Sequence, residues 1–411
     1  MKKHSENILP VLLGGDLNAY SMATSLKRGR GLNSIVLARD RLAICDGPDY
    51  IKLHTVGNLD DHNVAVPVLL DIARRYPGSR LLLIPCADWY VEAVEYARDV
   101  LSPHYFMHLP DFATWRAVSD KASFAALMDS FSVPHPRGAV ICAGESVAAA
   151  ARGLSAPYVL KPTDSTEYFR HPFPGQSKVY FPNSIGECTE ISARIFDSGY
   201  GARLLIQERI GFGGKSAAPA TLTAYCDKSG RVICAVRGEV VLEERGKTSR
   251  GNYSAIVTSP LTKTDMRLIS LLEGIGYTGI ANFDLLRGDG GEVCLELNPR
   301  QGRSFDYMRA AGINLANMIV DEMCGAAQKP HFIYKEGFWR EASLRTVVMN
   351  ADDPALLARA VALEREGNGV FAYDHVRGEG IPHKIYVALR TARCGRRFSK
   401  YKKEAGGYAP L

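Results

Sequence analysis

The chain has 411 residues, which at about 150 residues per domain allows two or three domains and a large core. Its 46% hydrophobic and 23% charged residues are typical of a globular protein and exclude collagen-like and disordered chains. No apolar run approaches the roughly 20 residues needed to cross a bilayer, so we expect no transmembrane helix. Nine scattered cysteines without a CxxC pair indicate reduced thiols and a cytoplasmic protein.

Residues 1–110 alternate between strand-like and helix-like segments. Short apolar runs at 10–13, 34–38 and 81–85 are separated by helical patterns at 19–27, 64–74 and 90–100. This alternation predicts an N-terminal α/β domain with a mainly parallel sheet. Asp16, Asn18 and Asp88 follow two of these strands, at the sheet edge where such domains bind ligands, although helix capping explains the aspartates equally well.

The next two segments are predicted to be separate α+β units. Residues 111–208 contain a helix with Lys121, strands at 139–142 and 158–161, a loop at 162–176, a helix at 184–198 and a strand at 204–208. Antiparallel strands at 221–227 and 232–242 begin a further unit, 209–335. Residues 336–411 form a C-terminal extension, in which 336–380 carry no motif that we can interpret.

Gly214-Lys215-Ser216 is similar to the end of a phosphate-binding GxxxxGK[ST] loop. The first glycine of that motif is replaced by Arg209, and a strand-like segment follows where a helix is required. We therefore interpret these residues as a flexible turn.

A β-hairpin with its turn at 288–291 carries the most informative residues. Alternation predicts one face with Cys294, Glu296 and Asn298 and an inward apolar face with Val293, Leu295 and Leu297. A turn with an odd number of residues puts Asp284 opposite Glu296, whereas a two-residue turn pairs Asp284 with Leu295. The sequence leaves both registers open.

Two carboxylates and an amide oxygen on one face form a site suited to Mg²⁺. Arg300 and Arg303 follow the second strand, where they could hold a phosphoryl group or a carboxylate. Lys161 ends an apolar strand and Lys121 lies early in a helix, so both could reach a bound phosphate. The alternative is an ordinary solvated hairpin face with solvated lysines.

The ordered set Lys121, Lys161, Gln207, Glu208, Ile210, Asp284, Glu296 and Asn298 resembles the ATP-grasp superfamily over roughly residues 110–330. The resemblance implies an ATP-grasp fold with an N-terminal parallel-sheet domain, a small central lid subdomain and a C-terminal antiparallel catalytic subdomain. It also implies that the lysines contact ATP phosphates, that Gln207, Glu208 and Ile210 form a hinge over adenine, and that Asp284, Glu296 and Asn298 bind Mg²⁺.

Four segments, 10–23, 251–253, 277–284 and 298–304, resemble more narrowly the D-aspartate ligases of Gram-positive bacteria. This resemblance implies that ATP activates a carboxylate of D-aspartate as an acyl phosphate. The aspartyl group is then transferred to the lysine side-chain amine of a lipid-linked or nucleotide-linked peptidoglycan precursor. Lys161, Arg300 and Arg303 would then be catalytic, and Asp16, Asn18 and Asp88 would hold the amino acid.

Two positions depart from the ATP-grasp pattern. The loop after Lys161 lacks the usual glycines, so hydroxyl groups such as that of Ser165 would contact the triphosphate. Lys215 stands where an acidic residue usually binds ribose. Two alternatives stay open: a ligase for another amino acid or a dipeptide, and a non-catalytic protein that binds ATP as a regulatory signal.

The +6 net charge is concentrated at the C-terminus, since residues 384–411 have eight basic residues and one acidic residue. This clustering does not favour nucleic-acid binding, which needs basic residues spread over a face. The basic residues of this tail alternate with Ile385, Tyr386, Val387, Leu389 and Phe398. Two interpretations remain: peripheral contact with the inner face of an anionic membrane, or a partly disordered solvated terminus.

Overall fold

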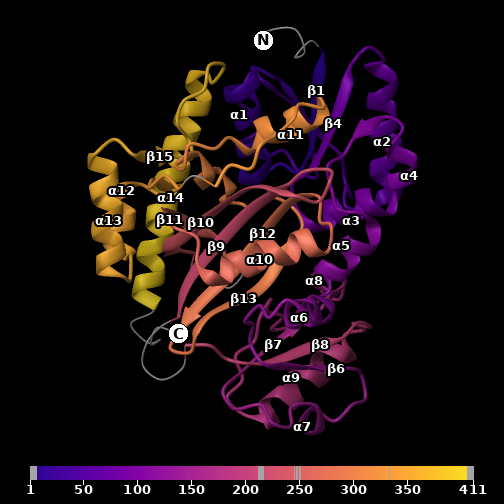
Figure 1. The fold of residues 1–411 in the computed structure, drawn as a ribbon, viewed down its shortest axis with the longest axis vertical. Helices are drawn as coiled ribbons and strands as arrows, with labels where there is room; N and C mark the ends of the chain where they lie inside the picture. Colours follow the sequence, from indigo (N-terminus) through magenta and orange to yellow (C-terminus); the bar gives the residue numbers. More distant parts are fainter. Residues whose placement is uncertain are drawn as a thin grey trace.

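The computed structural model describes residues 7–211, 217–244, 246, 249, 251–332 and 334–404, with side chains to residue 400. Lys215 and the Gly214-Lys215-Ser216 turn lie outside the described residues. Figure 1 shows an N-terminal domain above, a small unit below, and a large sheet between them.

The N-terminal domain is a parallel sheet with strand order β3-β2-β1-β4-β5, as predicted. Its elements are β1 (Ile8–Leu13), α1 (Leu17–Arg30), β2 (Ser34–Ala38), β3 (Ile51–Thr55), α2 (His62–Arg75), β4 (Arg80–Pro85), α3 (Asp88–Tyr96), α4 (Arg98–Leu101) and β5 (Tyr105–Phe106). Apart from the half-buried Leu9, the apolar residues of β1, β2 and β4 are buried on both faces, which explains their continuous hydrophobic runs. Asp16 caps α1 by accepting from the backbone N–H of Asn18 at 3.1 Å.

The small central unit has a three-stranded antiparallel sheet with order β6-β8-β7. It contains α5 (Phe112–Ser119), α6 (Lys121–Ser130), β6 (Gly138–Ile141), α7 (Val147–Ala150), β7 (Tyr158–Pro162), α8 (Ser165–Arg170), α9 (Ile185–Asp197) and β8 (Leu204–Glu208). The loop predicted at 162–176 is partly wrong, because α8 forms there. Asp164 caps this helix by accepting from the Glu167 N–H at 2.9 Å.

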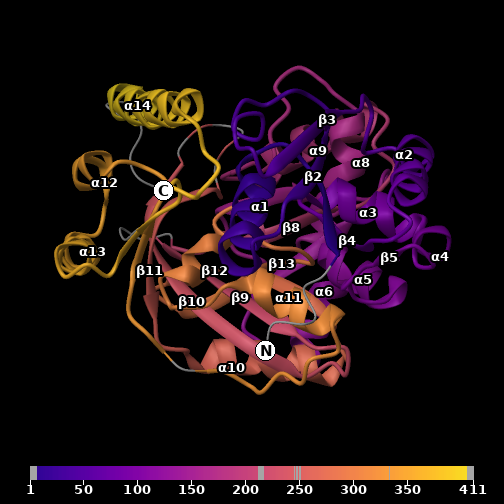
Figure 2. The same ribbon diagram turned by 90° about the horizontal axis from the view of Figure 1, so that it is seen from above.

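The large sheet has the order β13-β12-β9-β10-β11-β14-β15 and is antiparallel except for its last pair. Its main strands are β9 (Ala218–Cys226), β10 (Val232–Glu243), β11 (Tyr253–Ser259), β12 (Gly279–Gly288) and β13 (Gly291–Asn298). One face packs against α6 and α10 (Lys263–Gly274). The other face packs against α1, the 3₁₀ turn η1 (Phe305–Arg309) and α11 (Leu315–Met323), which brings the N-terminal domain against the sheet (Figure 2).

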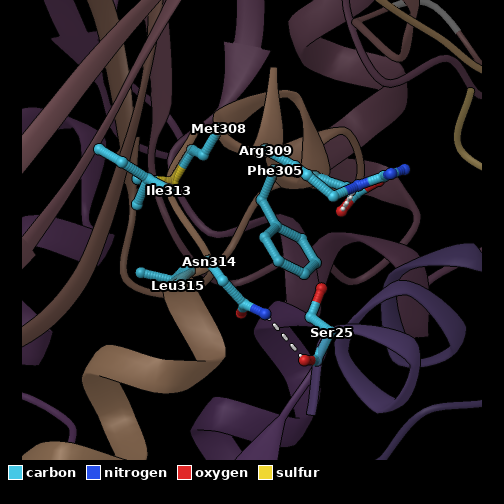
Figure 3. Close-up of a pocket in the computed structure, with 8 residues that line it drawn as sticks. Ser25, Phe305, Met308, Arg309, Ile313, Asn314 and Leu315 are labelled. Atoms are coloured by element: carbon cyan, nitrogen blue, oxygen red, sulfur yellow. Dashed lines mark hydrogen bonds and ion pairs between the residues drawn. The ribbon is translucent and has the colours of Figure 1, made fainter. Parts of the chain in front are cut away.

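Figure 3 shows the junction between η1, α11 and α1. Asn314 donates to the carbonyl oxygen of Ser25 at 2.9 Å. The cavity at this junction has a volume of only about 10 Å³ and is lined by none of the predicted site residues. It is therefore a packing junction, and the functional site lies elsewhere.

Residues 336–380, which carry no motif, complete the large sheet. They form β14 (Phe338–Arg340), α12 (Leu344–Asn350), α13 (Pro354–Arg365) and β15 (Gly369–Phe371), and β14 pairs with β11. The final helix is α14 (Ile381–Glu404), so the basic tail is helical as far as residue 404, and the rest of it lies outside the described residues. Glu379, just before α14, accepts from Tyr20 at 2.7 Å and Tyr50 at 2.8 Å, which attaches the C-terminal segment to the N-terminal domain.

Candidate active site

A β-bulge sets the register of the β12–β13 hairpin. Gly288 pairs with Gly291, so the turn has two residues, and Leu285 pairs with Cys294. The register then shifts by one residue at Leu295, and Asp284 pairs with Glu296. Of the two alternatives for the turn, the two-residue one occurs, but the prediction that it pairs Asp284 with Leu295 is wrong, because the bulge brings Asp284 opposite Glu296.

The same bulge changes the predicted faces of β13. Cys294 and Leu297 are buried in one core cluster, whereas Val293 and Leu295 are only half-buried. The prediction that Cys294 shares a face with Glu296 and Asn298, opposite Leu297, is thus wrong, because the extra residue rotates the strand between positions 294 and 296.

Asp284, Glu296 and Asn298 come together on the hairpin. Asn298 Nδ2 donates to Asp284 Oδ2 at 3.2 Å. Burial and the neighbouring Glu296 raise the pKa of Asp284 to about 6. These three residues therefore supply oxygen atoms around a point where negative charge is costly, and that donor set fits a divalent cation.

Lysines from the central unit face the acidic residues. Lys161, in β7, is buried, and burial lowers its pKa to about 8 despite the opposing effect of Glu296. Lys121, the first residue of α6, lies with Nζ 4.0 Å from Glu296 Oε2 and donates to Ser165 Oγ at 3.2 Å. Burial disfavours the ionised form of Glu296, but Lys121, Lys178 and Lys161 outweigh it and lower the pKa of this carboxyl group to about 2. The lysines and carboxylates thus form one connected electrostatic cluster.

Arg300 connects this cluster to the N-terminal domain. Its Nη2 atom donates to Asp88 Oδ2 at 2.8 Å and to Asn298 Oδ1 at 3.3 Å, while its buried Nε has no hydrogen-bond partner in the described part of the chain. Asn18 is buried and donates to the carbonyl oxygen of Gln301 at 3.1 Å. Asp88 and Asn18 therefore contact the loop that follows β13, whereas Asp16 is exposed and its side chain caps α1.

Arg303 is directed toward the C-terminal segment. Its Nη2 atom lies 3.1 Å from Glu341 Oε1, and Glu341 also accepts from Tyr373 at 2.8 Å and from Arg390 at 3.2 Å. The Oε2 atom of Glu341 is buried and without a partner among the described residues. Arg303 is thus held by residues of a segment in which the sequence revealed no motif.

The predicted hinge residues lie at the end of β8 and just after it. Gln207 is buried in the centre of the small sheet, between β6 and β7. The carboxylate of Glu208 accepts from the Ser155 N–H at 2.8 Å. Ile210 lies against Gly288, where a Cβ atom would come within 2.7 Å of Ile210 Cγ2, so the glycine allows the hairpin turn to approach the central unit.

Two site residues were not predicted as such. Tyr253 lies in β11, and burial raises its pKa well above the usual value, so its hydroxyl group keeps its proton and donates to Asp284 Oδ1 at 3.2 Å. Lys178 is exposed, yet its charge acts on both Glu296 and Asp284. Tyr253 belongs to a segment that resembles the family, whereas nothing in the sequence distinguishes Lys178 from other surface lysines.

Comparisons with known proteins agree with this geometry. No protein-family model matches the chain. The chain is 29% identical over 326 residues to D-aspartate ligase of Enterococcus faecium (strain Aus0004), and the match covers 77% of each protein.

Solved structures share the fold at low sequence identity. An ADP complex of N5-carboxyaminoimidazole ribonucleotide synthetase has a TM-score of 0.62 and 12% identity, covering 96% of this chain and 97% of that one. The L-amino acid ligase from Bacillus licheniformis has a TM-score of 0.54 and 13% identity, covering 78% of this chain and 75% of that one.

The chain has the ATP-grasp fold, as predicted. The predicted resemblance to the D-aspartate ligases is confirmed by this similarity to the Enterococcus faecium enzyme, which agrees with the expectation of an ATP-grasp ligase.

Proposed function

We propose that this protein uses ATP and Mg²⁺ to join the carboxyl group of an amino acid, D-aspartate, to the side-chain amine of a lysine in a peptidoglycan precursor. The observation that carries the proposal is the convergence of Asp284, Glu296 and Asn298 with Lys121 and Lys161. The similarity to D-aspartate ligase supports the choice of amino acid.

Amide formation from a carboxylate and an amine is unfavourable in water, because an oxide is a poor leaving group. ATP would supply a phosphoryl group to the carboxylate, so that the amine can attack the acyl carbon of an acyl phosphate and expel phosphate. No nucleophilic side chain of the enzyme is needed for these two steps.

The residues of the chain would bind and orient the reacting groups. Asp284, Glu296 and Asn298 would hold Mg²⁺, while Lys121 and Lys161 would contact phosphate oxygens. Ser165 Oγ, which accepts from Lys121 at 3.2 Å, lies at the N-terminus of α8 in a position to contact the same phosphates.

The two arginines would divide the remaining tasks. Arg300 touches Asn298 and Asp88, so we assign it to the transferring phosphoryl group, with Asp88 beside the amino acid. Arg303 is held by Glu341, and we assign its guanidinium to a carboxylate of the amino acid. Gln207, Glu208 and Ile210 would line the adenine side of the hinge.

Product analysis tests the proposal directly. The full chain is incubated with ATP, Mg²⁺, D-aspartate and a lysine-containing muropeptide, and ADP release and product mass are measured. We expect ADP release that requires both substrates and a product whose mass equals that of the two substrates minus one water.

The matched variants are Glu296→Gln and Glu292→Gln, which change neighbouring glutamates of β13. Glu292 contacts Thr262 and Arg237, away from the lysines. Loss of turnover in Glu296→Gln with retention in Glu292→Gln is the expected result. Turnover with L-amino acids but not with D-aspartate would overturn the D-aspartate assignment. ATP binding without turnover across a broad substrate panel would overturn the proposal that the protein is a ligase.

A further inference from the structure

Helix α14 is attached to the protein by one face. His383, Cys394 and Phe398 are buried on that face. Arg390 donates to Tyr373 at 2.7 Å and to Glu341 at 3.2 Å. Figure 2 shows the helix in yellow at the edge of the molecule, outside α12 and β11. The helix is therefore fixed in orientation, and its opposite face is directed to solvent.

The opposite face has an exposed apolar stripe. Ile381, Ile385 and Leu389 are 74%, 55% and 48% exposed, and their spacing of four residues puts them on one side of the helix. Ala388 and Ala392 are exposed on the same side of the helix. Large aliphatic side chains at this spacing are ordinarily buried, so the stripe is a surface that no residue described by the structure covers.

Basic residues accompany this stripe. Lys384, Arg393, Arg396 and Lys400 are exposed on the same helix. The sequence from Ile381 to Lys403 contains no aspartate or glutamate. The solvent face is thus apolar in its first half and strongly cationic in its second half.

We propose that the exposed face of α14 lies on the surface of an anionic lipid bilayer, with the Ile381, Ile385 and Leu389 side chains inserted among the lipids. An apolar stripe on a segment that has many basic residues and no acidic residue matches an interfacial helix, because the aliphatic groups enter the acyl boundary while the cations contact lipid phosphates. No helix in the described ranges is long and apolar enough to cross a membrane, so the contact is peripheral.

The same helix is connected to the candidate active site. Arg390 on its buried face contacts Glu341, and Glu341 contacts Arg303. Membrane contact through α14 would therefore hold the active site close to the bilayer surface. This last consequence depends on the proposed function, since a lipid-linked acceptor would be presented there, whereas the lipid contact itself does not depend on it.

Vesicle binding without any substrate tests the proposal. The full chain is sedimented with vesicles of phosphatidylcholine alone and with vesicles that also contain phosphatidylglycerol. We expect binding to the anionic vesicles only, and we expect salt to weaken it. Absence of binding to the anionic vesicles would overturn the proposal.

Two triple variants separate the contributions of the surface. Ile381→Ser/Ile385→Ser/Leu389→Ser removes the stripe, and Lys384→Glu/Arg393→Glu/Arg396→Glu reverses the charge. Each basic residue near an anionic surface raises the membrane partition coefficient about fivefold. Loss of three of them should therefore weaken vesicle binding at least about a hundredfold. Unchanged binding in both variants would overturn the proposal.

Matched controls alter equally exposed residues elsewhere. Val100→Ser/Met266→Ser/Val348→Ser changes side chains that are 50%, 52% and 47% exposed, and Lys228→Glu/Lys263→Glu/Lys329→Glu reverses three other exposed lysines. Both controls should bind like the wild type. An equal loss of vesicle binding in the controls would overturn the assignment of the stripe to lipid. The same holds if the wild type is a dimer without lipid and the stripe variant is a monomer. Ligase activity does not enter these measurements, so failure here is distinguishable from failure of the proposed function.

Discussion

Arg300 and Asp88 form an ion pair of 2.8 Å between two parts of the protein that are 212 positions apart in the chain. Arg300 follows the last strand of the hairpin, and Asp88 begins α3 of the N-terminal domain. The pair holds the arginine beside Asn298, where its buried Nε has no hydrogen-bond partner among the residues that the structure describes. The N-terminal domain thus contributes directly to the geometry of the candidate active site.

Asp88→Asn removes the charge that holds Arg300. We expect kcat to fall about tenfold, which corresponds to the loss of one charge-assisted hydrogen bond, and we expect the KM for ATP to stay unchanged. Because Asp88 is 46% exposed at its side chain, the free energy of unfolding should change by less than about 1 kcal/mol. Steady-state ADP release checks the first result, with Asp71→Asn, on the exposed face of α2, as control. Wild-type kcat in Asp88→Asn would contradict the role of the pair.

Asp284→Asn should stabilise the metal-free protein. The pKa of Asp284 is raised to about 6 in the folded state, so its carboxyl group ionises more readily in the unfolded chain. This difference lowers the free energy of unfolding as pH rises from about 4 to about 6, and the whole decrease is present at neutral pH. Replacing the carboxylate should therefore increase the free energy of unfolding by about 1–3 kcal/mol at pH 7 and by much less near pH 4. Urea unfolding at the two pH values measures this difference.

Mg²⁺ should stabilise the wild type but not Asp284→Asn. Added to the wild type with ATP analogue, it should raise Tm, because a ligand that binds only the folded state stabilises it. In Asp284→Asn the increase should be lost. An equal Tm increase in both proteins would mean that Asp284 is not a ligand of the cation.

The lowered pKa of Lys161 predicts that ATP binding depends on pH. Burial lowers the pKa of this lysine to about 8, so the free enzyme loses the cation as pH rises through that value. The KM for ATP should consequently rise about tenfold between about pH 7 and pH 9.5, equivalent to one lost charge-assisted contact. In Lys161→Arg the guanidinium stays charged, and the rise should disappear. A rise that is identical in Lys161→Arg would place the titrating group elsewhere.

Glu341→Gln tests how Arg303 is positioned. Glu341 is nearly buried and is contacted by Arg303, Arg390 and Tyr373, so loss of its charge should lower the free energy of unfolding by about 1–3 kcal/mol. We also expect a several-fold higher KM for the amino acid at unchanged KM for ATP. Glu364→Gln is the matched control, because Glu364 pairs with Arg340 at 2.7 Å in the same segment but does not touch the site. Equal effects of both variants on the KM for the amino acid would contradict the assignment of Arg303 to the amino-acid site.

The sequence was sufficient for the parts of the fold that depend on local patterns. Alternating strands and helices predicted the parallel N-terminal sheet, and the hairpin was predicted from two alternating strands around a glycine-rich turn. The pairing of Asp284 with Glu296 was one of two open registers. A bulge at Leu295 decided between them, and a bulge has no signature as simple as a turn residue.

The parts that could not be predicted depend on contacts between distant segments. Arg303 meets Glu341, Tyr373 and Arg390, and β14 pairs with β11 across about 80 positions of the chain. Neither contact follows from periodicity, because each involves short segments whose partners are determined by the tertiary fold. The same is true of Lys178, which is an ordinary exposed lysine until the fold brings it near Glu296.

The late position of β14 and β15 in the chain has a consequence for biosynthesis. Strand β11 is fully buried in the finished protein, and its outer edge pairs with β14, which is translated after the whole hairpin and η1. During that interval the nascent chain exposes an unpaired, hydrophobic strand edge. Such an edge can pair with another chain and cause aggregation, and chaperones bind surfaces of this kind.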